Sequence, residues 1–184
     1  FVGPVVQIDI SSKVIHLMTQ RYQKYLAEAS VKRMEFIVDD ANGLTALSPD
    51  SIGGGVVDKG LIDVLHLSGA MMSMDDNDIS ENLDGANNPI PRIIDSVHRV
   101  LQPSRPFVFF SRSGPEYILR RAFGTVHLDW DEEIRKKWMD IQVLKLLDLD
   151  MLLYRFVKAD PAETETETTR VTTRGYRKKK KRKS

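Results

Sequence analysis

The segment Val56-Val57-Asp58-Lys59-Gly60-Leu61-Ile62-Asp63 decides the fold. It opens with two β-branched residues, which favour a strand, and the strand ends in an aspartate before Gly60. Two earlier segments have the same form, Val5-Val6-Gln7-Ile8-Asp9 and Met34-Glu35-Phe36-Ile37-Val38-Asp39-Asp40. The chain therefore contains three predicted strands that each finish on an acidic residue.

Amphipathic helices are predicted between these strands and after them. One follows Asp9, with Ser11 and Ser12 as capping residues, and another runs from Pro91 until Pro103 stops it. Their apolar residues recur with helical spacing, as one stripe of Ile15, Met18, Tyr22, Tyr25 and Ala29 and a second of Ile93, Ile94, Val97, Val100 and Leu101.

The C-terminal half adds further strands to the same pattern. Residues 107–111 read as a fully buried strand, 115–123 as a short helix, and 141–147 with 152–157 as two antiparallel strands. Alternating strands and helices predict an α/β fold with a mostly parallel sheet and a C-terminal antiparallel hairpin. Ligands of such sheets bind at the carboxyl ends of the strands, where the three acids would gather. Each acid taken singly is also explained as a polar strand end facing solvent.

Composition excludes several classes of protein. The 184 residues include no cysteine, which rules out disulfide scaffolds, thiolate zinc sites and cysteine nucleophiles. No apolar run approaches the roughly 20 residues that cross a bilayer, and the start lacks the features of a signal peptide, so we expect a soluble, cytoplasmic protein without membrane contact. Because the chain begins on apolar residues without an initiator methionine, we also expect that an N-terminal piece is missing.

Charge divides the chain into two parts at residue 160. Residues 161–184 contain nine Lys or Arg and three Glu, whereas residues 1–160 contain 18 basic and 23 acidic side chains. A Glu/Thr repeat followed by a lysine-rich run cannot bury enough apolar surface to fold. We therefore predict a folded domain over 1–160 and a disordered tail over 161–184. The basic run Arg170–Lys183 is a solvated tail, a nuclear localisation signal or a contact for RNA or another polyanion.

The acid-ended strands, and above all Asp58-Lys59-Gly60-x-x-Asp63, resemble a known family. They look like the Rossmann-like, class I methyltransferases that use S-adenosyl-L-methionine, in the methyltransferase-like group that includes the elongation factor 1-alpha lysine methyltransferases. The resemblance follows the order of the family's motifs over residues 1–160. It implies transfer of a methyl group to a lysine or an N-terminal amine of a protein substrate, with a translation factor as a candidate.

The resemblance also implies a cofactor site. Asp9, followed by Ile10, would accept hydrogen bonds from the ribose hydroxyls of S-adenosyl-L-methionine, and Asp40 would bind the adenine amino group with Ala41 flanking the ring. Asp39 is the alternative to Asp40 if the register differs by one residue. Asp58 and Lys59 would lie near the methionine end, although an ion pair explains Lys59 equally well. The sequence identifies no general base and no metal site.

One family feature is missing from the chain. The glycine-rich loop of the family follows its first strand, and this sequence starts after that point, so the first strand is absent. Gly53-Gly54-Gly55 is no substitute because it precedes a strand. Since the first strand is central in the family's sheet, we expect unpaired edges on the strands either side of its place, and weak or no binding of the cofactor by this chain.

Three other functions stay open beside the enzyme. A methyltransferase-like protein without activity would use the fold as an interaction module and the basic tail for docking. A nucleic-acid binder would depend on the tail alone. A nucleotide-dependent dehydrogenase also places an acid at the end of its second strand, but Asp58-Lys59-Gly60 and the hairpin argue against it.

Substrate choice is expected in two polar segments, 73–88 and 124–140. The second contains Trp130 and Trp138 among acidic residues, which predicts either an aromatic rim for a basic partner or an amphipathic surface helix. The acidic run 75–78 lacks the glycine and glutamate of a calcium-binding loop. The histidines have neither catalytic nor metal-ligand spacing and are expected in packing or at the surface: His16, His66, His98 and His127.

Overall fold

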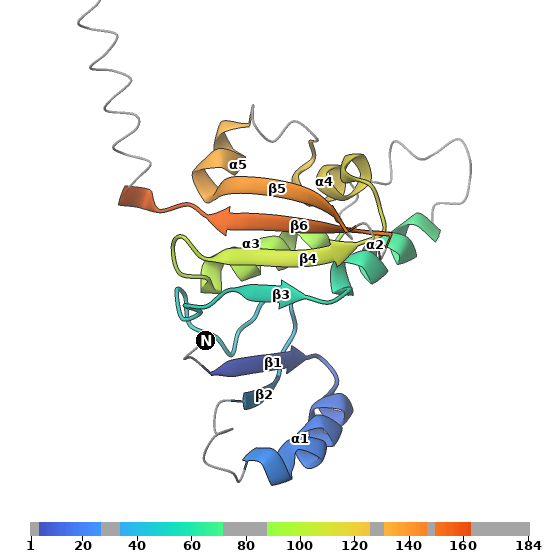
Figure 1. The fold of residues 1–184 in the computed structure, drawn as a ribbon, viewed down its shortest axis with the longest axis vertical. Coiled ribbons are helices and arrows are strands. Elements are labelled where there is room, and N and C mark those ends of the chain that lie inside the picture. Colours follow the sequence, from blue (N-terminus) through green and yellow to red (C-terminus); the bar gives the residue numbers. More distant parts are fainter. Residues whose placement is uncertain (1–3, 27–33, 72–87, 126–130, 147–149, 163–184) are drawn as a thin grey trace, which may run out of the picture.

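A computed structural model describes residues 4–26, 34–71, 88–125, 131–146 and 150–162 (Figure 1). Strands and helices alternate over much of its length, which gives the α/β fold that the sequence predicted. The elements in chain order are β1 (Val5–Asp9), α1 (Ser12–Leu26), β2 (Met34–Val38), β3 (Val56–Asp58), α2 (Leu61–Met71), α3 (Ile90–Val100), β4 (Pro106–Ser111), α4 (Pro115–Phe123), α5 (Glu132–Lys137), β5 (Trp138–Leu146) and β6 (Met151–Lys158).

The strands form two sheets. β1 pairs with β2 in parallel, and the second sheet has the order β3-β4-β6-β5. Within that sheet β3 is parallel to β4, while β6 lies between β4 and β5 and runs antiparallel to both. The predicted C-terminal hairpin of β5 and β6 is therefore confirmed, and β6 is the strand that runs against its neighbours.

The edges of the two sheets that face each other are unpaired. β1 and β3 point the same way in Figure 1, but they belong to different sheets and are not hydrogen-bonded to each other. Val57, in the middle of β3, is 60% exposed, which is unusual for a strand inside an α/β domain. The arrangement agrees with the expectation of unpaired edges on either side of the family's first strand.

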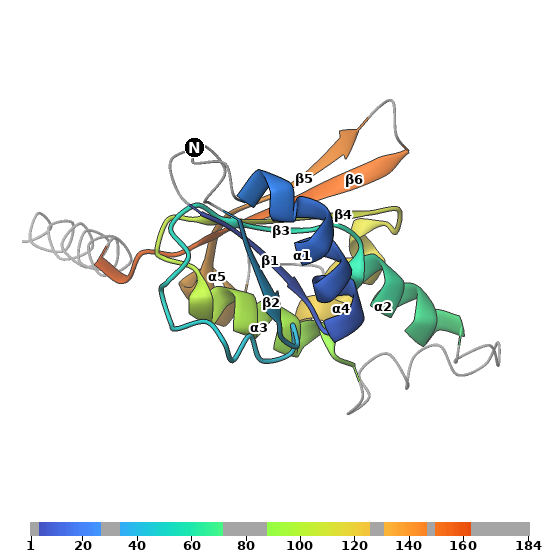
Figure 2. The ribbon, with the colours of Figure 1, turned by 90° about the horizontal axis from the view of Figure 1, so that it is seen from below.

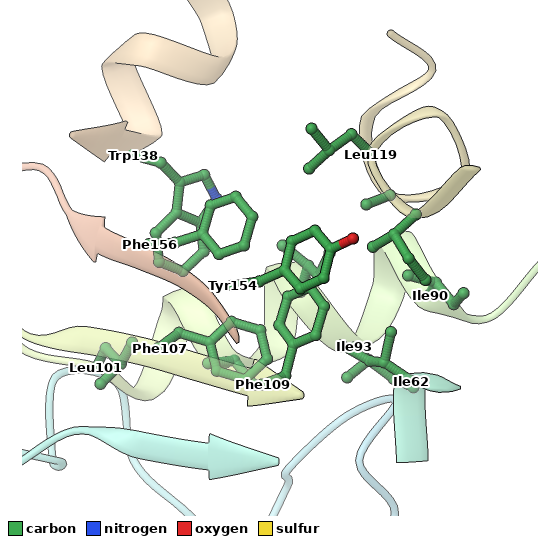
Figure 3. Close-up of a cluster of buried hydrophobic side chains, with 14 of the residues drawn as sticks. Ile62, Ile90, Ile93, Leu101, Phe107, Phe109, Leu119, Trp138, Tyr154 and Phe156 are labelled. Carbon is green, nitrogen blue, oxygen red and sulfur yellow. The ribbon is translucent and has the colours of Figure 1, made fainter. Parts of the chain in front are cut away.

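The core is built on the inward face of β4 and β6. Side chains along β4 alternate between buried and half-buried, so Phe107, Phe109 and Ser111 all point to one side. The ring of Phe109 stacks on Tyr154 of β6, with ring centres 4.6 Å apart and planes 3° from parallel. Figure 3 shows these rings gathered with Phe156 and Trp138 into one aromatic cluster.

Helix α3 covers this aromatic cluster. Its apolar residues recur every three or four positions, as the sequence predicted, and Figure 2 shows α3 and α4 on one face of the larger sheet. Pro91 occupies its first turn, where the missing backbone N–H costs no hydrogen bond. The buried residues of the helix are Ile90, Ile93, Ile94, Ser96, Val97 and Val100.

One expectation about residues 124–140 is wrong. Trp138 was expected on an exposed rim or surface helix, but it begins β5 and is 1% exposed in the core. The neighbouring acids do form a helix, since Asp131 caps α5 by accepting hydrogen bonds from Glu133 N and Ile134 N. Burial of the indole against Phe156 outweighs the polar character of the segment that precedes it.

Several expectations lie outside the described residues. Trp130, His127, segment 73–87 and the tail beyond residue 162 are not described, so their predicted roles stay predictions. Among the described helices, none has the length and apolar character to cross a membrane.

Candidate functional site

The carboxyl ends of β1 and β2 bring the first predicted site residues together. Asp9 is opposite Val38 in the parallel register, and the backbone N–H of Asp39 donates to the carbonyl oxygen of Asp9 at 3.2 Å. Asp39 and Asp40 therefore follow directly beyond Asp9 at the same edge of the sheet. This edge is where open α/β sheets bind ligands.

Asp9 offers an oriented carboxylate with a free oxygen. Its Oδ1 accepts a hydrogen bond from the backbone N–H of Ser11 at 2.8 Å, which fixes the side chain where the chain turns into α1. No residue in the described part of the chain donates a hydrogen bond to Oδ2. Ile10, immediately beyond, is 69% exposed. The end of β1 therefore offers a carboxylate oxygen and, one residue further along the chain, an exposed apolar side chain.

Asp39 and Asp40 differ sharply in their surroundings. Both oxygens of Asp39 are occupied, because Oδ1 accepts from Asp40 N (2.8 Å) and from the Thr45 hydroxyl (3.2 Å) while Oδ2 accepts from Ala46 N (2.8 Å). Partial burial opposes ionisation of Asp39, but these hydrogen bonds outweigh it and lower the pKa of the carboxyl below its ordinary value. Asp39 therefore holds its own loop together.

Asp40 is the more available of the two acids. Its side chain is exposed, and its Oδ1 accepts only from the backbone and side-chain nitrogens of Asn42, at 2.9 and 3.0 Å. Oδ2 receives no hydrogen bond in the described part of the chain. Ala41 is half-buried and packs against the core cluster. The geometry favours Asp40 over Asp39 as the ligand-facing residue.

Asp58 caps helix α2. Its Oδ1 accepts from the backbone N–H groups of Gly60 and Leu61, at 3.1 and 2.8 Å, and its Oδ2 accepts from Ile62 N at 2.9 Å. A negative charge in this position also stabilises the positive end of the helix dipole. Gly60 has a φ of +115°, which only glycine adopts without strain. Most of the hydrogen-bonding capacity of Asp58 is therefore used by the fold.

Lys59 is exposed, and it forms no ion pair with any residue of the described segments. It lies at one side of a cavity of about 410 Å³ at the carboxyl ends of β3 and β4. The lining residues are Lys59, Gly60, Asp63, Val64, Phe110, Arg112 and Met151. Asp9 and Asp40 do not line it, so the structure divides the predicted site residues between the carboxyl ends of two separate sheets.

Sequence reasoning missed the polar residues that organise this cavity. Oδ1 of Asp63 accepts from the hydroxyl of Ser111 at 2.5 Å and from the backbone N–H of Arg112 at 3.3 Å. The position of Asp63 at the end of the Asp58-Lys59-Gly60-x-x-Asp63 pattern was the available signal. A second signal was the pair Ser111 and Arg112, two polar residues that come directly after an aromatic and apolar run.

The described residues contain no group of three His, Asp or Glu side chains that could hold a metal ion. His66 is buried, and burial together with the nearby Arg121 charge lowers its pKa. His98 contacts the edge of Trp138, with ring centres 5.0 Å apart, and burial lowers its pKa as well. These two histidines have the packing role that the sequence predicted.

Comparison with solved structures identifies the class of fold. The structure of the complex between the Haloferax volcanii Trm112 methyltransferase activator and the putative methyltransferase is similar to this chain with a TM-score of 0.50 and 14% identity, covering 86% of this chain and 73% of the matched chain. A possible exported protein from Bordetella parapertussis gives a TM-score of 0.52 at 12% identity, over 85% of this chain and 54% of that one.

A third similar structure concerns the conversion of a disulfide bond into a thioacetal group during echinomycin biosynthesis. It has a TM-score of 0.50 and 13% identity over 92% of this chain and 73% of the matched chain. No protein-family model and no curated protein sequence matches the chain. The chain therefore has the α/β fold of Rossmann-like methyltransferases, and these likenesses show the fold alone.

Proposed function

We propose that the protein is an S-adenosyl-L-methionine-dependent methyltransferase whose cofactor lies along the carboxyl edge of β1, β2 and β3. The observation that carries the proposal is the free Oδ2 of Asp9, held in place through Oδ1 by Ser11 N. A fixed carboxylate oxygen can accept hydrogen bonds from a ribose hydroxyl without reorganising. Ile10 would pack against the adenine ring, and Oδ2 of Asp40 would accept a hydrogen bond from the adenine amino group.

The chain's residues fit that cofactor along the rest of the edge. Ala41, small and half-buried, leaves room for a ring beside Asp40. Asp58 would place a negative charge near the positively charged sulfonium, and Lys59 would lie near the methionine end, close to where the methyl group leaves. The cofactor supplies an electrophilic methyl group, and the protein's task is to hold it close to the acceptor and in line with it.

The finer parts of the proposal concern the methyl acceptor and the location of the protein in the cell. The acceptor would be a lysine or N-terminal amine of a protein, with a translation factor as a candidate, and the enzyme would be cytoplasmic. The basic run Arg170–Lys183 would provide either nuclear entry or a contact with a polyanion such as RNA. The resemblance of Asp58-Lys59-Gly60-x-x-Asp63 to the methyltransferase-like group is what supports the protein substrate.

Titration calorimetry with S-adenosyl-L-methionine tests the proposal. We compare the chain with its Asp9→Ala variant, with circular dichroism to confirm that each is folded. We expect weak binding by the chain, which Asp9→Ala abolishes. If no folded version binds, the proposal is wrong and a non-catalytic, methyltransferase-like interaction protein becomes the better account.

A further inference from the structure

We propose that the cavity between α2 and the end of β4 is the methyl-acceptor site, and that it selects an amine on a peptide with acidic residues beside the acceptor. The inference rests on the proposed function and adds to it the residues that would choose the substrate. Asp63 would accept a hydrogen bond from the acceptor nitrogen, and Lys59 and Arg112 would hold the acidic neighbours. These three residues line the same cavity of about 410 Å³.

A chain of hydrogen bonds holds Asp63 in position. Ser111, which is fully buried, donates its hydroxyl to Oδ1 of Asp63, and Ser111 Oγ in turn accepts from Ser113 N at 2.9 Å. The buried hydroxyl of Tyr154 donates to the carbonyl oxygen of Ser113 at 2.8 Å. Burial raises the pKa of Tyr154 well above its ordinary value, so the hydroxyl stays protonated and remains a donor.

This arrangement leaves one oxygen of Asp63 for a ligand. Oδ1 accepts from both Ser111 and Arg112, whereas Oδ2 receives no hydrogen bond from the described residues. A carboxylate that is fixed through one oxygen and free at the other is a preorganised acceptor at the wall of a cavity. Holding the N–H of a neutral amine there would orient the nitrogen lone pair.

The charges around the cavity favour an acidic substrate. The side chains of Lys59 and Arg112 are exposed at its rim, and neither forms an ion pair within the described segments. Asp63 is the single carboxylate among the lining residues, so the lining carries a net positive charge. The two cations would attract acidic side chains and would repel a basic stretch.

The acceptor amine would react in its neutral form, because the nitrogen lone pair is the attacking group. In the transfer, the nitrogen lone pair forms a bond to the methyl carbon, the carbon–sulfur bond breaks with its electrons going to sulfur, and the extra proton on nitrogen leaves to solvent. No oxidant, metal or further reactant is needed for this balance.

The shape of the cavity suits a segment of peptide more than a small molecule. Val64, which forms part of the wall, is 63% exposed, and Lys59 and Arg112 are exposed as well. Sites for small molecules usually enclose most of the ligand, which this open site would not do. Val64, Phe110 and Met151 give an apolar surface for the methylene groups of a lysine side chain.

The test uses short peptides with one central lysine flanked by glutamate, glutamine or lysine, and radiolabelled S-adenosyl-L-methionine as the donor. The protein is the full chain in the form that binds the cofactor. We compare it with Lys59→Glu/Arg112→Glu and with the control Arg105→Glu. Arg105 is exposed and precedes β4 at its amino end, whereas Arg112 follows the same strand at its carboxyl end.

We expect the unmodified protein to label the glutamate-flanked peptide about tenfold faster than the lysine-flanked one, as two partly exposed ion pairs would allow. The charge-reversed double variant should invert that preference, and Arg105→Glu should leave it unchanged. Asp63→Asn should lower kcat at least about tenfold while the Kd for S-adenosyl-L-methionine stays the same. Substituting residues that only supported the fold would not reverse the preference between acidic and basic flanking residues.

Each other outcome has a definite meaning. Labelling without a preference for acidic flanks, or a preference that the double variant leaves unchanged, overturns the inference and leaves the proposed function standing. Cofactor binding without labelling of any peptide overturns the inference as well, since the acceptor is then not an amine of a peptide. Failure to bind the cofactor at all overturns the proposed function, and the inference with it.

Discussion

The backbone N–H of Asp39 donates a hydrogen bond to the carbonyl oxygen of Asp9, with nitrogen and oxygen 3.2 Å apart. This bond extends the pairing of β1 and β2 by one residue and places two acidic segments side by side at the end of the sheet. Adjacent positions in the sequence nevertheless have different tasks here. Asp39 is bound on both oxygens by its own loop, and Oδ2 of Asp40 accepts no hydrogen bond from the described residues.

The pair Asp39→Asn and Asp40→Asn separates stability from binding. Asp39→Asn should lower the free energy of unfolding by about 1–2 kcal/mol, because an amide replaces an acceptor of three hydrogen bonds. Asp40→Asn should leave stability nearly unchanged and weaken S-adenosyl-L-methionine binding about tenfold, in the version of the protein that binds it. Urea denaturation and calorimetry measure the two effects, and the reverse assignment would show that Asp39 faces the ligand.

Asp58 should prove important for stability through helix α2. Replacing it by alanine removes the acceptor of three backbone N–H groups in the first turn, which should cost about 1–2 kcal/mol of unfolding free energy. Asp58→Asn is the matched control, since an asparagine side chain still caps a helix and should cost less. Equal loss in both variants, measured by urea denaturation, would mean that the charge and not the hydrogen bonds holds the helix.

The stacked pair of Phe109 and Tyr154 should dominate the stability of the larger sheet. Phe109→Ala leaves a cavity at the centre of the aromatic cluster and should cost about 3–5 kcal/mol. Tyr154→Phe keeps the ring and removes only the hydrogen bond to Ser113 O, so it should cost about 1 kcal/mol. Thermal and urea unfolding test this order, and a larger loss for Tyr154→Phe would contradict it.

Stability should fall as the pH drops below neutrality. Burial lowers the pKa values of His66 and His98 below their ordinary value of 6.5, so the unfolded chain binds protons that the folded chain does not. The contribution of these two histidines to the unfolding free energy is therefore fully present above about pH 6.5. It is lost as the pH falls through their lower, folded-state pKa values. The carboxyl of Asp39 adds a further loss in the same direction at lower pH, below its ordinary value of 3.8.

Urea denaturation at a series of pH values measures this dependence. His66→Gln should reduce the slope between about pH 7 and pH 5. A slope that is the same in the protein and in His66→Gln would show that His66 does not titrate with folding.

The helices and strands were largely predictable, because neighbouring residues determine them. The acid-ended segments 5–9 and 56–58 are strands, the segment 34–40 is a strand as far as Val38, and the apolar spacing from Ile93 to Val100 does form a helix. β5 begins at Trp138, three residues before its expected start. The sequence around Trp138 is polar and predicted exposure, whereas contact with Phe156, which lies on the neighbouring strand, buries it.

The candidate site was predictable only in part. The strand-end acids Asp9, Asp40 and Asp58 could be selected from their place after apolar runs. In the structure Asp58 caps α2, and Asp39 accepts hydrogen bonds from Thr45 and Ala46. Both arrangements depend on loop conformations, which hydrophobic patterning does not encode. Asp63 was noticed only as the end of the Asp58-Lys59-Gly60-x-x-Asp63 motif and was given no role, because its partner Ser111 is distant in the sequence.

The sequence by itself determined the local structure and the order of the elements, since backbone preferences and apolar spacing act over a few residues. The tertiary structure decided which polar groups meet. Ser111 reaches Asp63 across 48 positions of the chain because parallel pairing of β3 and β4 sets the end of one strand beside the helix that follows the other. A contact between residues so far apart is determined by how the sheet and helices pack, and no local pattern predicts it.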